Sequence, residues 1–158
     1  MRRWQPAMPK RKKGKPSPTP PAEKQIPSRK GHLPGSDNSH ERLAWRFTHA
    51  DHEGRWRFCD LQGDELRDVL QKMSHLESMT VGEVRATRKL FKEYELPGGL
   101  IDEAIQRLVD MGRDDMTAIH RLEFTGTQRL YGFLHSNVFH VVWWDPKHEI
   151  WPSKKRHT

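Results

Sequence analysis

Residues 129–144 of this chain read RLYGFLHSNVFHVVWW. Two runs rich in apolar and aromatic residues flank Ser136 and Asn137, a pair that suits a tight two-residue turn. Such a turn predicts an antiparallel hairpin in which position 135 lies opposite 138, 133 opposite 140, 131 opposite 142 and 129 opposite 144. Because cross-strand partners share a face of the sheet, the register also predicts which side chains lie together.

This register gives the hairpin two unlike faces. One face is apolar and is expected to lie in the core: Leu130, Gly132, Leu134, Phe139, Val141 and Trp143. The other face combines a cation, a phenol, two imidazoles and an indole: Arg129, Tyr131, Phe133, His135, Val138, His140, Val142 and Trp144. We therefore predict that Trp143 packs in the core, whereas Trp144 is available to stack on a ligand.

The preceding segment IHRLEFT, residues 119–125, reads as a neighbouring strand. Period-two alternation places Arg121 and Glu123 on the same face as Arg129 and Tyr131. This polar face is open to two interpretations. It is an ordinary solvated face with a Glu123–Arg129 ion pair, or it is a working surface, since imidazoles transfer protons near neutral pH and aromatic rings stack on bases.

The segment upstream predicts an N-terminal hairpin and about three helices. Residues 43–61 contain two short aromatic runs around turn residues 51–54, which favours a β-hairpin. Apolar residues at helical spacing predict a helix from about residue 63 to 78, and Thr80 with Glu83 forms a capping-box pattern ahead of a second helix through residue 96. A third helix is expected over residues 101–111. The predicted fold class is thus α+β, with a C-terminal antiparallel sheet of three or more strands.

Charge is distributed very unevenly along the chain. Of the 28 basic and 21 acidic residues, residues 1–30 hold ten and one, which leaves 18 basic and 20 acidic residues for the remainder. Eight of the 11 prolines also precede residue 41. We predict a disordered basic arm over residues 1–40, a single domain over 41–153 and a basic tail over 154–158.

The arm either contributes salt-sensitive affinity for RNA or DNA or serves only as a solubilising linker. The residues expected to contact phosphates are Lys10, Arg11, Lys12, Lys13 and Lys15.

Several classes of protein are excluded by what the sequence lacks. Cys59 is the only cysteine, so no internal disulfide or thiolate metal cluster is expected. Histidines and carboxylates do not occur at metal-ligand spacing, and no phosphate-binding glycine loop is present, so we expect neither a metal nor a small-molecule cofactor. Without an apolar run long enough for a membrane span, the chain is expected to be cytoplasmic, with no membrane partner.

The segment RLYGFLHSNVFHVVWWDPKHEIWP resembles the C-terminal half of RelE/ParE-superfamily toxins, small bacterial proteins that cleave or block translated mRNA or bind gyrase. It is also similar to uncharacterised small bacterial proteins that end in a WxDPxHxxYP-like sequence. The resemblance covers roughly residues 118–152 and implies a RelE-like fold. Arg129 matches the basic residue that opens the RLxY strand of the ribonuclease members, and His148 stands where a charged or imidazole group follows their last strand.

This resemblance implies an RNA-directed toxin of the kind that acts as a metal-independent endoribonuclease on mRNA at the ribosome, with an acidic antitoxin as partner. The reaction would be attack of a ribose 2′-OH on the adjacent phosphate. His140 with His148 or His135 would transfer protons. Arg129 and Arg121 would hold the phosphate, and Tyr131 or Trp144 would stack on a base. The alternative is a non-enzymatic module that binds nucleic acid or a protein partner through the same face.

Overall fold

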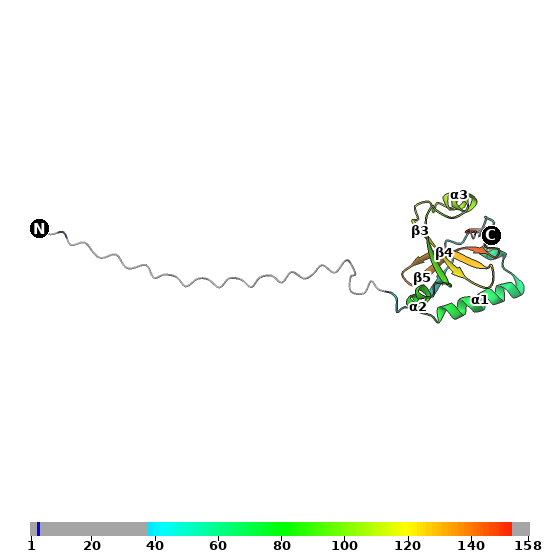
Figure 1. The fold of residues 1–158 in the computed structure, drawn as a ribbon, viewed down its shortest axis with the longest axis horizontal. Coiled ribbons are helices and arrows are strands. Elements are labelled where there is room, and N and C mark those ends of the chain that lie inside the picture. The colour runs from blue at the N-terminus through cyan, green and yellow to red at the C-terminus, as the bar shows by residue number, and fades with distance from the viewer. Residues whose placement is uncertain (1–2, 4–37, 153–158) are drawn as a thin grey trace, which may run out of the picture. The chain divides into compact units, whose positions relative to one another are not determined.

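The structure is a computed structural model that describes Arg3 and residues 38–152 (Figure 1). The predicted basic arm, including Lys10, Arg11, Lys12, Lys13 and Lys15, and the basic tail fall outside the described residues. The elements in chain order are β1 (Ala44–Arg46), the 3₁₀ helix η1 (Phe58–Asp60), α1 (Gly63–Glu77), α2 (Val81–Ala86), β2 (Phe91–Glu95), α3 (Asp102–Asp110), β3 (Ala118–Glu123), β4 (Arg129–His135) and β5 (Val138–Asp145).

The strands form one mixed sheet in the order β1-β5-β4-β3-β2. β1 runs parallel to β5, and the other neighbouring pairs are antiparallel. The predicted α+β class and the β3-β4-β5 antiparallel unit are confirmed. No helix in the described ranges combines the length and apolar character needed to cross a membrane.

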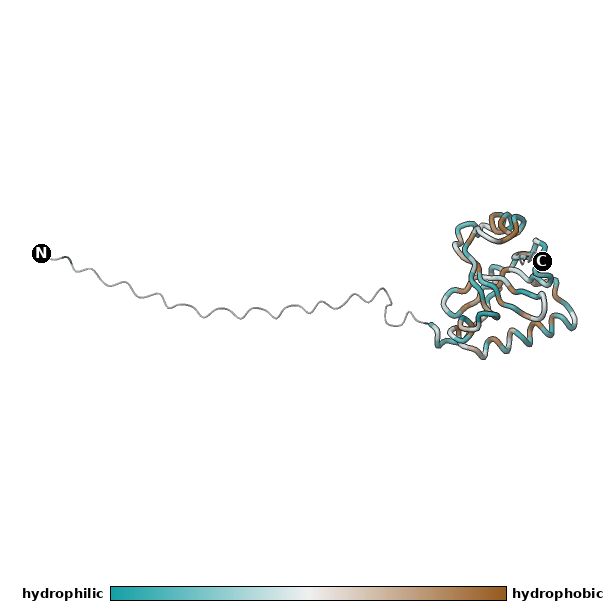
Figure 2. Tube along the Cα trace, in the orientation of Figure 1, coloured by the Kyte–Doolittle hydropathy of each residue, from teal (hydrophilic) through white to brown (hydrophobic). Residues whose placement is uncertain are grey.

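Helices cover both faces of the sheet, with α1 and α2 on one side and α3 on the other (Figure 1). The apolar stripe of α1 is visible as alternating brown and teal turns in Figure 2. On what we call the α1 side, Met73 and Leu76 pack with Leu130, Phe139 and other apolar residues of the sheet. On the α3 side, Ala104 and Leu108 pack against the opposite face. Both faces of the β4-β5 hairpin are therefore largely buried.

A β-bulge interrupts the hairpin between Tyr131 and Gly132. Near the turn the predicted register holds, with Phe133 opposite His140 and Gly132 opposite Val141, but Tyr131 pairs with Trp143 instead of Val142. Val142 is the extra residue. For the residues of β5 after Val142, each side chain lies on the face opposite to the predicted one, as expected when one residue is inserted.

The bulge makes the predicted faces of the two tryptophans wrong. Trp144 pairs with Leu130 and belongs to the α1-side core, whereas Trp143 lies in the α3-side core. Arg129 is opposite Asp145 instead of Trp144. Trp143 is buried as predicted, but Trp144 is only 3% exposed and is not available for stacking.

Gly132 explains why the bulge forms at this point. A Cβ built on Gly132 would collide with the carbonyl oxygen of His140 and the ring of Phe139. The two backbones approach more closely here than a side chain permits, which is a common role for glycine inside a strand.

The predicted N-terminal hairpin is not formed. Only residues 44–46 make a strand, and they pair with β5. The second aromatic run follows the β5 bulge without regular pairing: Asp51 N donates to Val142 O at 3.0 Å, and Trp144 N donates to Trp56 O at 2.9 Å. Backbone groups that the bulge leaves unpaired in the sheet are thus satisfied by this segment.

The second helix is shorter than predicted. The capping box is confirmed, since Thr80 accepts a hydrogen bond from Glu83 N and the Glu83 carboxylate accepts one from Thr80 N. However, α2 ends at Ala86, and residues 91–95 form the edge strand β2. Pairing with β3 buries Phe91, a gain that overrides the helical propensity of this charged segment. The predictions of α1 and α3 are confirmed.

Candidate functional site

Polar side chains gather on the α3 side of the sheet, where β4 begins and β5 ends. In the register of the sheet Arg121 lies opposite Tyr131, and Glu123 lies opposite Arg129. His148, just after β5, is close enough for both arginines to affect its pKa. We call this group the arginine cluster: Tyr94, Arg121, Glu123, Arg129, Tyr131 and His148. Four of the residues selected from the sequence are therefore brought together.

The two guanidinium groups are buried and share one carboxylate. Arg121 is 4% exposed and Arg129 is 7% exposed. Arg121 donates to Glu123 at 3.2 Å and to the Tyr94 hydroxyl at 3.2 Å. Arg129 lies 3.5 Å from the same Glu123 oxygen and donates to the carbonyl oxygens of Gly126 and Gln128.

Asp145 is also buried nearby, but both of its oxygens accept backbone hydrogen bonds, from Glu149 N at 3.0 Å and Ile150 N at 2.9 Å. Its carboxylate makes no ion pair with either arginine. Within residues 38–152, Glu123 is the one carboxylate that forms an ion pair with these guanidinium groups.

Several polar atoms of the cluster are buried without a hydrogen-bond partner in the described part of the chain. They are Arg121 Nε, Arg129 Nε, Tyr131 OH and His148 Nε2. An unsatisfied buried polar group costs about 1–3 kcal/mol, so a concentration of such groups at one place requires an explanation. Arg121 Nε, Arg129 Nε and Tyr131 OH can each donate a hydrogen bond, and a bound anion would accept these hydrogen bonds.

The surroundings of His148 favour its neutral form, and those of Tyr131 favour its protonated form. Burial lowers the pKa of His148, and the charges of Arg129 and Arg121 lower it further, although Asp145 and Glu123 oppose this. Burial raises the pKa of Tyr131, so its hydroxyl keeps its proton across the neutral range. His148 can therefore accept a proton near pH 7, while Tyr131 can donate a hydrogen bond.

The turn after β5 positions His148. Asp145 accepts the backbone hydrogen bonds of Glu149 and Ile150 in this turn. Thr127 also donates to the carbonyl oxygen of Pro146 at 2.6 Å, which ties the turn to the β3-β4 loop. His148 itself has a φ of 56°, a left-handed conformation that is uncommon for residues other than glycine.

His140 and His135 lie at the opposite end of the hairpin. The five residue steps of β5 from His140 to Asp145 span about 16 Å at the usual rise of a strand. The structure therefore does not bring His140 together with His148, whereas His135 lies close enough to His140 to affect its pKa. Strand alternation predicted that these histidines share a face of the sheet, but it did not take their separation along the strand into account.

The sequence-based prediction missed a stacked pair of aromatic rings that includes Tyr94 of the arginine cluster. Tyr94 and Trp151 stack with ring centroids 3.9 Å apart and an interplanar angle of 11°. Tyr94 was assigned to a helix, although the alternation in FKEYE, residues 91–95, was an available strand signal. Trp151 was expected only to pack.

Within the described residues, no group of three or more histidine, cysteine, aspartate or glutamate side chains is arranged to hold a metal ion. Comparisons of the chain with protein-family models, curated proteins and solved structures found no match. Functional inference must therefore be based on the arginine cluster itself.

Removing the Tyr131 hydroxyl is expected to stabilise the fold. Tyr131→Phe is expected to raise the free energy of unfolding by about 1 kcal/mol, because it deletes a buried hydroxyl without a partner among the described residues. Tyr94→Phe is the matched control: its hydroxyl accepts from Arg121, so its loss is expected to cost about 1 kcal/mol. Denaturant titration of both variants measures these changes. A destabilising Tyr131→Phe would mean that the hydroxyl already has a structural partner.

Proposed function

We propose that this chain is an RNA-directed, toxin-like protein and that the arginine cluster is the site of a metal-independent endoribonuclease. The observation that carries the proposal is that four buried polar atoms of this cluster, on two arginines, a tyrosine and a histidine, have no hydrogen-bond partner among the described residues. A phosphodiester supplies the acceptors that these donors lack. The resemblance to RelE-like ribonucleases points to the same two residues, Arg129 and His148. We also propose that the fold has a RelE-like topology.

The chemistry requires three roles. His148 Nε2 removes the proton of a ribose 2′-OH, and the 2′-oxygen forms a bond to the adjacent phosphorus. The bond from phosphorus to the 5′-oxygen breaks, and that oxygen takes up a proton, which leaves a 2′,3′-cyclic phosphate and a 5′-hydroxyl. Arg121 and Arg129 stabilise the charge that develops on the phosphoryl oxygens, and Tyr131 donates a hydrogen bond.

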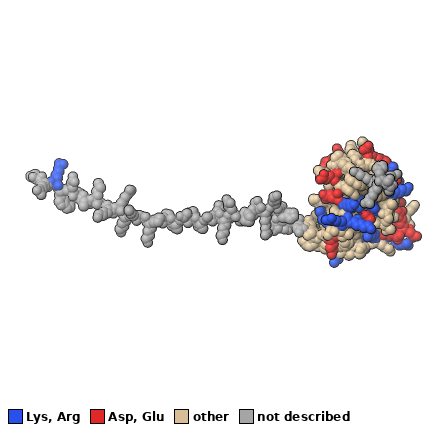
Figure 3. All heavy atoms as spheres, viewed as in Figure 1, with Lys and Arg blue, Asp and Glu red and all other residues tan. Residues whose placement is uncertain are grey.

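The distribution of charge agrees with local recognition of phosphate. On the face seen in Figure 3, Lys and Arg side chains cross the middle of the folded unit while acidic side chains lie around them. The described domain is thus not uniformly basic. General affinity for a polyanion is assigned in this proposal to the arm, and cleavage to the arginine cluster.

His148→Asn tests the proposal. Asparagine tolerates the positive φ at this position, so the backbone is preserved while the base is lost. Cleavage of labelled RNA by the full chain, with and without ribosomes, is expected to fall about a hundredfold. His52→Asn, which alters an exposed histidine outside the cluster, is the control and should cleave normally.

A second candidate function follows from the low exposure of Arg121 and Tyr131, at 4% and 0%. In this alternative the cluster organises a non-enzymatic surface that binds RNA or an acidic protein such as an antitoxin. Absence of cleavage by the unmodified chain, combined with weakened RNA binding by His148→Asn, would favour this module. Unchanged RNA binding and cleavage in His148→Asn would reject a functional role for the cluster.

A further inference from the structure

A second concentration of positive and titratable groups lies at the other end of the β4-β5 hairpin. We call it the histidine cluster: Arg46, His49, Arg113, His135 and His140. His49 and His140 stack with ring centroids 5.2 Å apart and an interplanar angle of 27°. Arg46 lies directly opposite His140 in the β1-β5 pair, and an Arg113 nitrogen lies 2.5 Å from His49 Nδ1.

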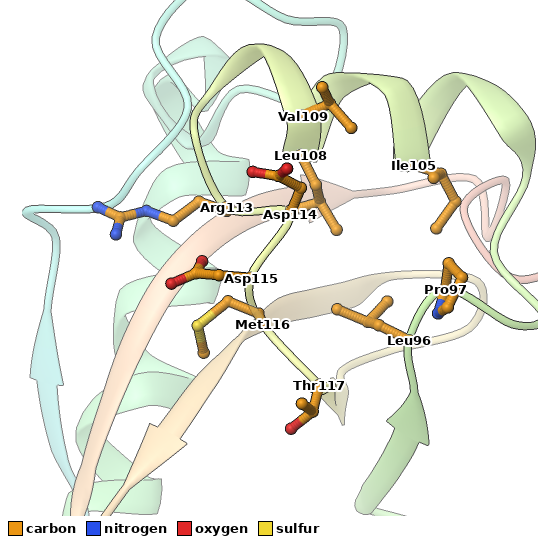
Figure 4. Close-up of a pocket in the computed structure, with 10 residues that line it drawn as sticks. All are labelled: Leu96, Pro97, Ile105, Leu108, Val109, Arg113, Asp114, Asp115, Met116 and Thr117. Carbon is orange, nitrogen blue, oxygen red and sulfur yellow. The ribbon is translucent and has the colours of Figure 1, made fainter.

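These side chains come from five separate places in the fold. Arg46 ends β1, His49 lies in the following loop, and Arg113 follows α3. His135 ends β4, and His140 lies in β5 and feels the charge of His135. In Figure 4, Arg113 extends away from the apolar residues Leu108 and Met116 toward the N-terminal segment.

No carboxylate neutralises this cluster among the described residues. Neither Arg46 nor Arg113 makes an ion pair there, and the neighbouring acids have other partners. Asp51 pairs with Arg107 at 2.8 Å, Glu53 lies 3.7 Å from Arg107, and Asp110 accepts from Gln106 at 3.0 Å. Asp114 and Asp115 follow Arg113 but make no ion pair with it.

The imidazoles respond to this environment. Burial lowers the pKa of His49, and the charges of Arg113 and Arg46 lower it further. Burial also lowers the pKa of His140, with added contributions from His49, Arg46, His135 and Arg113. No carboxylate is among the main causes of either shift. The Nδ1 atom of His140 is buried and lacks a hydrogen-bond partner in the described part of the chain.

The space beside the cluster is open to a small ligand. A cavity of about 290 Å³ lies beside the cluster and is lined by His49 and Arg113, by further residues of the loop after β1 that include Asp51, His52 and Glu53, and by Arg107, Asp110 and Met111. The Asp51 and Glu53 carboxylates of this lining lie against Arg107. A tetrahedral anion accepts several hydrogen bonds at once, which suits two guanidinium groups and imidazoles that approach from different elements.

We propose that the histidine cluster is a binding site for a phosphate group, and that binding tightens as pH falls and the imidazoles become cationic. The site is separate from the arginine cluster, and the proposal does not depend on ribonuclease activity. Two permanent charges from Arg46 and Arg113 supply binding at neutral pH. Protonation of His49 and His140 adds charge under mild acid, and the bound anion stabilises those protonated forms.

The test uses the full chain and follows histidine ring signals by NMR during titration with inorganic phosphate at pH 6. Shifts of the His49 and His140 signals are expected to saturate with a common Kd. Sulfate keeps a constant charge between pH 6 and 8, so any pH dependence of its binding comes from the protein. The Kd for sulfate is expected to be at least tenfold lower at pH 6 than at pH 8.

Arg46→Gln, at an exposed position, should weaken binding of both anions at least tenfold without changing the melting temperature. His75→Gln removes an exposed histidine from α1, on the other side of the sheet, and should leave the Kd unchanged. His148→Asn should also leave these signals unchanged, which separates the site from the arginine cluster. The proposal is overturned if the His49 and His140 signals do not move, if His75→Gln weakens binding as much as Arg46→Gln, or if sulfate binds equally at both pH values.

Discussion

Asp51→Ala is expected to lower the free energy of unfolding by about 3–5 kcal/mol, because it removes the partner of a partly buried cation and leaves several donors unsatisfied. The Asp51 side chain is fully buried and forms two hydrogen bonds of 2.8 Å with Arg107. It also accepts from Trp143 Nε1 at 3.0 Å and from the backbone N–H groups of Glu53 and Gly54. One carboxylate thus joins α3, β5 and the loop after β1.

The matched control is Glu53→Ala. Glu53 is 85% exposed and lies 3.7 Å from the same arginine, so its loss should cost less than about 0.5 kcal/mol. Denaturant unfolding of both variants measures the difference. Equal effects of the two substitutions would contradict the assignment of Asp51 as the structural partner of Arg107.

The same carboxylate makes stability depend on pH. Burial alone would raise the pKa of Asp51, but hydrogen bonds from Arg107, the backbone and Trp143 outweigh burial and hold the pKa well below its usual range. Because the folded-state pKa is depressed, the stabilisation is complete above the unfolded-state pKa of about 3.9 and is lost as pH falls below it. Asp51→Asn should flatten the acid limb of the stability curve.

Local signals predicted much of the secondary structure. The apolar spacing of Val69, Met73 and Leu76 identified α1, and all three side chains are buried in it. The Ser136-Asn137 turn was also correct, since these residues join β4 to β5 and Ser136 has a φ of 58°. These elements depend on interactions between residues that are close in sequence, which periodicity and turn chemistry describe directly.

Elements that depend on distant partners were predicted less well. β2 is an edge strand whose formation depends on β3, and β1 pairs with β5, almost a hundred residues later. Neither partner is apparent from the local pattern. Gly132, in the middle of a strand, was the available signal for a bulge, but glycine also occurs in regular strands, so its position alone does not fix the register.

The facing of the candidate site residues was predicted correctly where strand alternation was uninterrupted. Arg121, Arg129 and Tyr131 lie on β3 and on the first residues of β4, and they share the α3 side as expected. Trp144 lies beyond the bulge, so its predicted facing was reversed. His140 has the predicted facing but lies too far along β5, because alternation specifies a side of the sheet and contains no information about which end.

Trp144 provides the strongest test of the reversed register. If it stacked on a ligand at the surface, Trp144→Ala would affect function more than folding. In the structure its ring contacts Phe124 edge-on at 5.3 Å within the α1-side core, so Trp144→Ala is expected to cost about 3–5 kcal/mol. Trp143→Ala should cost a similar amount, because Trp143 packs edge-on against Trp56 in the α3-side core.

Phenylalanine substitutions distinguish the two positions, because the indole N–H groups differ. Trp143 Nε1 donates to Asp51, so Trp143→Phe loses a hydrogen bond to a charged acceptor, worth about 1.5–3 kcal/mol. Trp144 Nε1 is buried with no partner among the described residues, so Trp144→Phe removes an unsatisfied donor that offsets part of the lost packing. Thermal or denaturant unfolding should therefore rank Trp143→Phe as clearly more destabilising. If Trp144→Ala instead unfolded like the unmodified chain and reduced RNA binding, Trp144 would face solvent and the bulged register would be wrong.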